Sequence, residues 1–133
     1  MGAYVVTQLV KRMTQKRMPV QGARVLVMGL AFKENCPDLR NTRVVDILKE
    51  LKEYDVTADV FDPWVDPAEA QHEYGITPVA APAAGAYDAI ILAVAHRQFK
   101  DMGLTAVRAL GKPEHLLYDL KYVYRANESD LRL

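Results

Sequence analysis

Short apolar runs, separated by segments with helical periodicity, limit the folds that this chain can adopt. The runs are nearly continuous, and each is bounded by polar or turn-forming residues; they span 25–28, 58–61, 89–94 and 116–118. Strands that are buried on both faces of a parallel sheet have this composition, because helices cover both sides of the sheet. A weaker run at 76–79 is a further candidate strand.

Helical patterns alternate with these runs, and we expect helices over 4–16, 42–54, 67–74 and 104–110. Asn41 is the expected N-cap of the second helix. Asp66 should cap the third, with Pro67 at its first position, Glu69 completing a capping box and Gly75 ending it. The alternation predicts right-handed βαβ units. The expected class is therefore α/β: a three-layer, Rossmann-like open parallel sheet with helices on both faces, preceded by one N-terminal helix.

The formal net charge of zero is the sum of two unlike parts. Residues 1–24 hold five basic side chains and no acidic ones, which leaves 12 basic and 17 acidic groups for residues 25–133. A balanced chain that is 50% hydrophobic fits one globular domain and excludes a strongly basic nucleic-acid binder. No apolar run approaches the roughly 18 residues of a membrane span, and no signal-peptide pattern opens the chain. The single cysteine fits a cytoplasmic location.

The segment after the first expected strand, 29–41, is the first candidate site, because ligands bind beyond the carboxyl ends of strands in open α/β sheets. It is long for a βα loop. Its single glycine, Gly29, provides neither a G-x-G-x-x-G dinucleotide motif nor a Walker loop. Lys33, Arg40 and Arg43 lie instead near an expected helix N-terminus, which favours anions. These cations form either a phosphate site or surface ion pairs with acidic residues of the same loop.

Several motifs in a fixed order resemble the C-terminal domain of the UDP-glucose/GDP-mannose dehydrogenase family. The chain reads M-G-A-Y-V at 1–5, G-L-A-F-K at 29–33, D-L-R at 38–40, F-D-P at 61–63, D-A-I-I-L-A-V-A-H at 88–96 and D-L-K at 119–121. Together these motifs cover almost the whole chain. The branch to which the chain is most similar oxidises UDP-N-acetylhexosamines in surface polysaccharide biosynthesis.

The resemblance implies one module of a larger enzyme. Enzymes of this family oxidise the sugar C6 alcohol to a carboxylate with two NAD; they bind NAD in an N-terminal domain and dimerise through a long central helix. Residues 1–21 would then be the end of that helix with a linker, and 22–133 the UDP-sugar-binding domain. The NAD site and the catalytic residues would lie outside this chain, which alone should be inactive. The expected partners are the UDP-sugar and the two other domains, in a homodimer or larger assembly, without nucleic acid or membrane.

The resemblance also assigns candidate substrate-binding residues. The main chain around Phe32 would line the sugar nucleotide, and Lys33 would contact diphosphate or sugar oxygens. Asp38 would support the loop, with Arg40 near the phosphates or an adjoining domain. Lys121 stands where relatives often have arginine, so its contact would be looser, because lysine cannot form the bidentate fork.

Other reactive side chains have simpler explanations. Cys36 has no adjacent histidine, so we expect a loop thiol and not a nucleophile. The three histidines are isolated in the sequence and lack metal-ligand spacing, so no metal site is expected. His96 lies at the carboxyl end of an expected strand, where it could contact substrate or another domain. Asp62 and Asp66 could resemble an acid/base pair, although Asp66 is already explained as a cap.

Two other functions stay open. A non-enzymatic nucleotide-binding protein or a receiver-like regulatory module would share the expected fold. A receiver needs an acidic pair after its first strand, where this chain has Met28 and Gly29.

Overall fold

The structure is a computed structural model and describes residues 2–133. Strands and helices alternate through most of the chain, as predicted. The elements are α1 (Gly2–Gln15), β1 (Arg24–Met28), α2 (Val44–Glu53), β2 (Thr57–Phe61), α3 (Pro67–Tyr74), β3 (Tyr87–Leu92), α4 (Arg97–Arg108), β4 (Gly111–Asp119), the 3-10 turn η1 (Ala126–Glu128) and β5 (Leu131–Arg132). No helix within this described part is long and apolar enough to cross a bilayer.

The strands form one parallel sheet in the order β2-β1-β3-β4-β5. The chain leaves β1 in one direction to form β2 and returns to the other side of β1 to form β3. This reversal is a topological switch point, where open α/β sheets bind ligands. Met28 pairs with Phe61 on one side and Leu92 on the other, so the three central strands end together.

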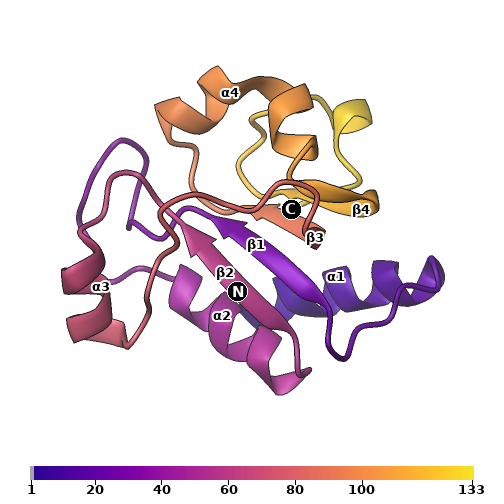
Figure 1. The fold of residues 1–133 in the computed structure, drawn as a ribbon, viewed down its shortest axis with the longest axis horizontal. Helices are drawn as coiled ribbons and strands as arrows, with labels where there is room; N and C mark the ends of the chain where they lie inside the picture. Colours follow the sequence, from indigo (N-terminus) through magenta and orange to yellow (C-terminus); the bar gives the residue numbers. More distant parts are fainter. Residues whose placement is uncertain (1) are drawn as a thin grey trace.

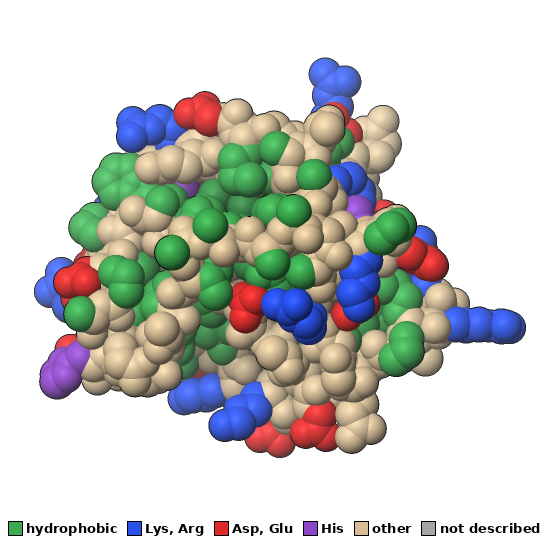
Figure 2. All heavy atoms as spheres, in the orientation of Figure 1, with side chains coloured by type: hydrophobic (Ala, Val, Ile, Leu, Met, Phe, Trp, Pro, Cys, Tyr) green, Lys and Arg blue, Asp and Glu red, His purple; other side chains and the backbone are tan. Residues whose placement is uncertain are grey.

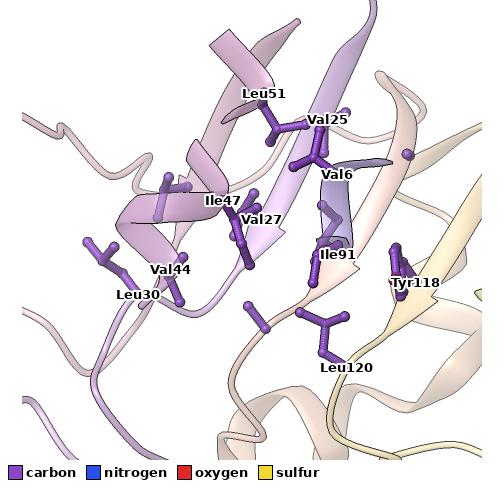
Figure 3. Close-up of a cluster of buried hydrophobic side chains, with 14 of the residues drawn as sticks. Val6, Val25, Val27, Leu30, Val44, Ile47, Leu51, Ile91, Tyr118 and Leu120 are labelled. Carbon is purple, nitrogen blue, oxygen red and sulfur yellow. The ribbon is translucent and has the colours of Figure 1, made fainter. Parts of the chain in front are cut away.

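Helices cover both faces of the sheet, which confirms the predicted three-layer class. Figure 1 shows α4 above the sheet and α1 and α2 below it. Along β1, Val25 and Val27 belong to the buried cluster under α1 and α2, whereas Leu26 and Met28 belong to the cluster under α4. This alternation follows from the two-residue period of a strand. In Figure 3, helix α2 points its apolar side chains at β1.

Helix α1 buries its apolar stripe in the core of this chain. The residues of that stripe are at most 1% exposed: Val5, Val6, Leu9 and Met13. Gly2 permits a close approach to α2, because a Cβ there would lie 2.7 Å from the backbone carbon of Asp46. Arg12 donates from Nη1 to the carbonyl oxygen of Asp130 at 2.8 Å, which ties α1 to the C-terminal segment. The predicted domain boundary after residue 21 stays a prediction.

The expected N-cap of α2 was wrong. Asn41 has a φ of 60° and turns the chain before the helix, a conformation that asparagine tolerates better than most residues. Arg43 directly precedes α2, and its side chain forms no capping bond. Thr42 takes part of that role, because its Oγ1 accepts the N–H of Val44 at 3.2 Å.

The bounds of α3 are those predicted, with Asp66 accepting a first-turn N–H and Gly75 in the left-handed conformation. The strand expected at 76–79 is not present in this described segment. Val79 donates its N–H to β2 at 2.8 Å. Pro78 has no N–H, which prevents a continuous hydrogen-bonded ladder there.

The C-terminal third differs most from the prediction. Helix α4 begins well before the expected 104–110, and its path bends at Gly103, where φ is 80° and ψ is 161°. Strand β4 begins earlier than expected, and β3 ends two residues earlier, at Leu92. Neither η1 nor β5 was predicted, because such short elements carry no periodicity.

The molecular surface carries charges of both signs. In the view of Figure 2, basic and acidic side chains lie in small mixed groups and form no single-sign patch on this face. This distribution agrees with the zero net charge of the sequence.

Candidate functional site

A pocket of about 300 Å³ opens at the switch point, beyond the carboxyl ends of β1, β3 and β4 and beside the start of α2. We call it the switch-point pocket, and we call residues 29–43, which connect β1 to α2, the site loop. Val44, Ile47 and Leu120 give the pocket an apolar floor. Figure 3 shows Val44 and Leu120 at the same end of the sheet.

Three basic residues line this pocket. Lys33 and Arg43 come from the site loop, Arg43 as its last residue, and Lys121 comes from the segment after β4. Glu34 is an acidic lining residue, so the basic charges outnumber it. The nearby helix N-terminus adds a partial positive charge, and the arrangement therefore suits an anionic ligand.

The structure brings together three of the five predicted substrate-binding residues. Phe32, Lys33 and Lys121 all line the pocket, and Phe32 is 52% exposed. Asp119 fixes the start of the Lys121 segment, because its carboxylate accepts the N–H of Lys121 at 3.1 Å and of Tyr124 at 2.8 Å. Asp119 begins the D-L-K motif, but the motif alone does not indicate that its side chain holds the following segment.

The other two predicted residues, Asp38 and Arg40, are not among the described residues that line the pocket. They pair with each other: Arg40 Nε lies 3.1 Å from Asp38 Oδ1, and Nη2 lies 3.1 Å from Oδ2. This contact with Arg40 holds the pKa of the Asp38 carboxyl below its usual value. The Asp38 carbonyl oxygen also accepts the N–H of Phe32 at 2.7 Å. The geometry is therefore that of an exposed pair within the site loop.

Asp62, at the end of β2, binds the beginning of the site loop. Its Oδ2 accepts the N–H groups of Leu30 at 2.7 Å and Ala31 at 2.9 Å, while Oδ1 accepts that of Trp64 at 2.8 Å. Burial raises the pKa of the Asp62 carboxyl, but the hydrogen bonds from His96 and these N–H groups outweigh burial and hold the pKa below its usual value. Asp62 is therefore a buried anion saturated with donors.

His96, after β3, is fully buried and binds the middle of the site loop. Its Nδ1 accepts the N–H of Asn35 at 2.9 Å, and its Nε2 lies 2.9 Å from Asp62 Oδ2. Because an N–H can only donate, Nδ1 must be unprotonated, and the hydrogen-bond network assigns the proton to Nε2. His96 therefore contacts the site loop in this structure and is not among the described pocket-lining residues.

Sequence reasoning missed these anchors of the site loop. Asn35 has a φ of 53°, and its Oδ1 accepts the N–H of Arg97 at the start of α4 at 2.7 Å. Thr42 donates from Oγ1 to the carbonyl oxygen of Leu30 at 2.7 Å. A signal was present in the polar residues of the loop, but the sequence did not show which distant elements they contact.

The turn after β1 does not form the glycine cradle in which a dinucleotide-binding domain holds NAD. Gly29 has a φ of 104°, and a Cβ there would lie 2.5 Å from Cβ of Val94. The missing side chain therefore makes room for Val94 and leaves no open cradle of the kind that a dinucleotide glycine motif provides. Within residues 2–133, no three His, Cys, Asp or Glu side chains gather as metal ligands do.

Comparison with known proteins agrees with this geometry. Residues 26–126 match the model of the UDP-glucose/GDP-mannose dehydrogenase family, UDP binding domain. The UDP-N-acetyl-D-glucosamine 6-dehydrogenase of Pseudomonas aeruginosa is 67% identical over all of this chain, and that of Salmonella typhi is 55% identical. The chain spans 32% and 31% of their respective lengths.

Solved structures of related proteins have the same fold. A UDP-glucose dehydrogenase from Pyrobaculum islandicum aligns over 98% of this chain and 28% of its own, with a TM-score of 0.73 and 27% identity. An NDP-N-acetyl-D-galactosaminuronic acid dehydrogenase from Methanosarcina mazei aligns over 96% of this chain and 26% of its own, with a TM-score of 0.81 and 18% identity; this second likeness concerns the fold alone. The family model matches well over half of the chain, so this chain belongs to the UDP-glucose/GDP-mannose dehydrogenase family and contains its UDP-binding domain.

Proposed function

We propose that this chain binds the UDP part of a UDP-N-acetylhexosamine, as the substrate domain of an NAD-dependent 6-dehydrogenase. The observation that carries the proposal is the convergence of Lys33, Arg43 and Lys121 on the switch-point pocket. Two curated relatives named as UDP-N-acetyl-D-glucosamine 6-dehydrogenases support this substrate class, because each aligns with the whole chain.

The chemistry of the pocket suits a nucleoside diphosphate. The diphosphate would lie near the basic residues and the start of α2, where charge and helix dipole both favour anions. The apolar floor of Val44, Ile47 and Leu120 would receive the flat base or the sugar ring. Lysine at 33 and 121 would make flexible point-charge contacts, while Arg43 is able to form a bidentate contact with phosphate.

The oxidation itself would occur outside this chain. The family resemblance implies that an N-terminal domain binds NAD and that residues elsewhere oxidise the sugar C6 alcohol to a carboxylate. Residues 1–21 would belong to the central helix of that enzyme, which we expect to be a cytoplasmic homodimer or larger assembly. Gly29 packs against Val94 and forms no dinucleotide glycine cradle, which supports placing NAD in another domain.

A receiver-like regulatory module is less well supported. Receiver chemistry needs an acidic pair after the first strand, and here β1 is followed by Gly29 and a loop that brings Lys33 to the pocket.

Titration of the ¹⁵N-labelled chain with UDP tests the proposal. We expect weak, saturable binding, in the millimolar range because other domains would normally close the site, with amide shifts at Lys33, Val44 and Lys121. ADP at the same concentrations is the matched control for a general nucleotide effect. An absence of saturable UDP shifts, or equal shifts with ADP, would overturn UDP recognition by this chain.

A further inference from the structure

We propose that Asp62 and His96 are positioning residues, a buried clamp that holds the site loop in its ligand-binding conformation. The inference rests on the proposed function, because it concerns the loop that carries Lys33. Neither side chain is among the described residues that line the pocket, so the clamp acts through the loop.

The clamp spans the end of the strand from which the site loop emerges. Asp62 follows β2 and His96 follows β3, and these strands flank β1 in the sheet. The contact between Asp62 Oδ2 and His96 Nε2, at 2.9 Å, therefore passes across the carboxyl end of β1. Both side chains have 0% exposed surface, so water does not compete for this contact.

The clamp holds the site loop on both sides of Phe32, Lys33 and Glu34, which line the pocket. Before them, Leu30 and Ala31 donate consecutive N–H groups to one oxygen of Asp62, and Ala31 also lines the pocket. After them, Asn35 donates its N–H to His96 Nδ1. The span between these anchors, residues 32–34, contains Phe32 and Lys33, and such a short span has few conformations left to lose on binding.

The composition of the clamp favours positioning over stability alone. A buried ionised carboxylate costs desolvation energy that an apolar residue of similar size would avoid. What the carboxylate provides is direction, because it accepts three backbone N–H groups and the His96 proton at fixed angles. His96 passes this restraint to Asn35, since one ring nitrogen donates while the other accepts.

The first test uses the unaltered 133-residue chain. ¹⁵N spectra should show His96 neutral at pH 7, with the proton on Nε2 and a pyridine-like Nδ1. The Leu30, Ala31 and Asn35 amides should exchange with solvent about 100-fold more slowly than in an unstructured peptide, although they lie in an irregular loop. Unprotected amides, or a proton on Nδ1, would overturn the clamp whether or not UDP binds.

The second test uses variants that break one contact each. His96→Gln keeps an amide donor toward Asp62 but places no acceptor at the Nδ1 position, whereas His96→Asn places its Oδ1 there. We expect His96→Gln to speed exchange at Asn35 by about tenfold and to raise the UDP dissociation constant by about fivefold. In His96→Asn, the exchange rate at Asn35 and the UDP dissociation constant should stay close to those of the unaltered chain. Equal effects of the two variants would show that His96 acts through packing and not through its acceptor.

The third test separates the clamp from the proposed function. Asp62→Ala removes every acceptor, so it should weaken UDP binding about fivefold and release Leu30 and Ala31, whereas Asp66→Ala, at an exposed cap four residues later, should change neither. If the unaltered chain fails to bind UDP but its amides are protected, the proposed function fails and the clamp stands. If it binds UDP and Asp62→Ala folds and binds equally well, the clamp fails and the function stands. If Asp62→Ala does not fold, the spectra of the unaltered chain and the two His96 variants decide.

Discussion

The carboxylate of Asp62 lies 2.9 Å from the imidazole Nε2 of His96, and the contact joins two strands that are not neighbours in the sheet. The strand between them, β1, ends beneath this contact and continues into the site loop. A charge-assisted hydrogen bond in a buried setting is stronger than an exposed one. The contact therefore stabilises the carboxyl end of β1, which is the end of the sheet where open α/β proteins bind their ligands.

Stability should depend on pH through Asp62. The pKa of this carboxyl is lowered in the folded chain, so the folded state binds its proton less readily than the unfolded state. The contribution to the free energy of unfolding is complete above the unfolded pKa of about 4 and is lost as pH falls through the folded value. Asp62→Asn should reduce the unfolding free energy by about 2–4 kcal/mol at pH 7 and make it depend less on pH in the acid range. Urea unfolding between pH 2 and pH 7 measures the free energy and its pH dependence. The same loss of stability on acidification in the variant would show that Asp62 is not the titrating group.

Gly29→Ala should be strongly destabilising. Alanine would have to adopt the positive φ of Gly29, and its Cβ would overlap the side chain of Val94. Together these two effects should lower the free energy of unfolding by about 2–5 kcal/mol. Gly22→Ala is the matched control: its φ is also positive, at 81°, but nothing lies within 4 Å of the new atom, so it should cost about 1 kcal/mol. Chemical denaturation compares the two, and equal losses would show that the approach to Val94 does not matter.

Tyr118→Phe should leave stability unchanged or raise it by up to about 1 kcal/mol. The Tyr118 side chain is fully buried on β4, and its hydroxyl has no hydrogen-bond partner within residues 2–133. Burial also raises the pKa of this hydroxyl, so it stays protonated. Tyr87→Phe is the counterpart, because the Tyr87 hydroxyl donates to Asp59 at 2.7 Å, and its loss should cost about 1–2 kcal/mol. Thermal unfolding of both variants measures the two changes in stability, and an equal loss in both would contradict this difference between the two hydroxyls.

Lys33→Ala, made in the longer enzyme that we propose contains this chain, should raise the KM for the UDP-sugar roughly tenfold and leave the KM for NAD nearly unchanged. Arg40→Ala should change the UDP-sugar KM less than about twofold, since Arg40 pairs with Asp38 outside the pocket. Steady-state kinetics with each substrate varied in turn provides the measurement. Equal losses for both substrates would argue against Lys33 as a UDP-sugar contact.

The sequence predicted the parts of the fold that local patterns encode. Buried parallel strands are continuous apolar runs, and β1 contains its whole run, 25–28, with Arg24 added at the start. The cap and stop of α3 are chemical signals within a few residues of the helix, and both are confirmed. Strand β5 has only two residues, Leu131 and Arg132, and is held by pairing with β4, which no local pattern announces.

The candidate site divides in the same way. Lys33 and Lys121 were found through motifs, and both line the pocket. The role of Asp62 was missed because its partners are distant in sequence: Leu30 lies 32 residues away and His96 lies 34 residues away. The motif places Arg40 near the phosphates or an adjoining domain, which stays a prediction; in this chain Arg40 pairs with Asp38, two residues earlier. Which partner a polar side chain contacts depends on the tertiary structure, and the local sequence does not specify it.

A crystal structure of this chain with UDP would show directly where the nucleotide binds. We expect the diphosphate in the switch-point pocket, within hydrogen-bonding reach of Lys33, Arg43 or Lys121, and with the site loop held by Asp62 and His96. UDP bound elsewhere, for instance in the second cavity beside the edge strand β2 that Lys52 and Ile76 line, would contradict it.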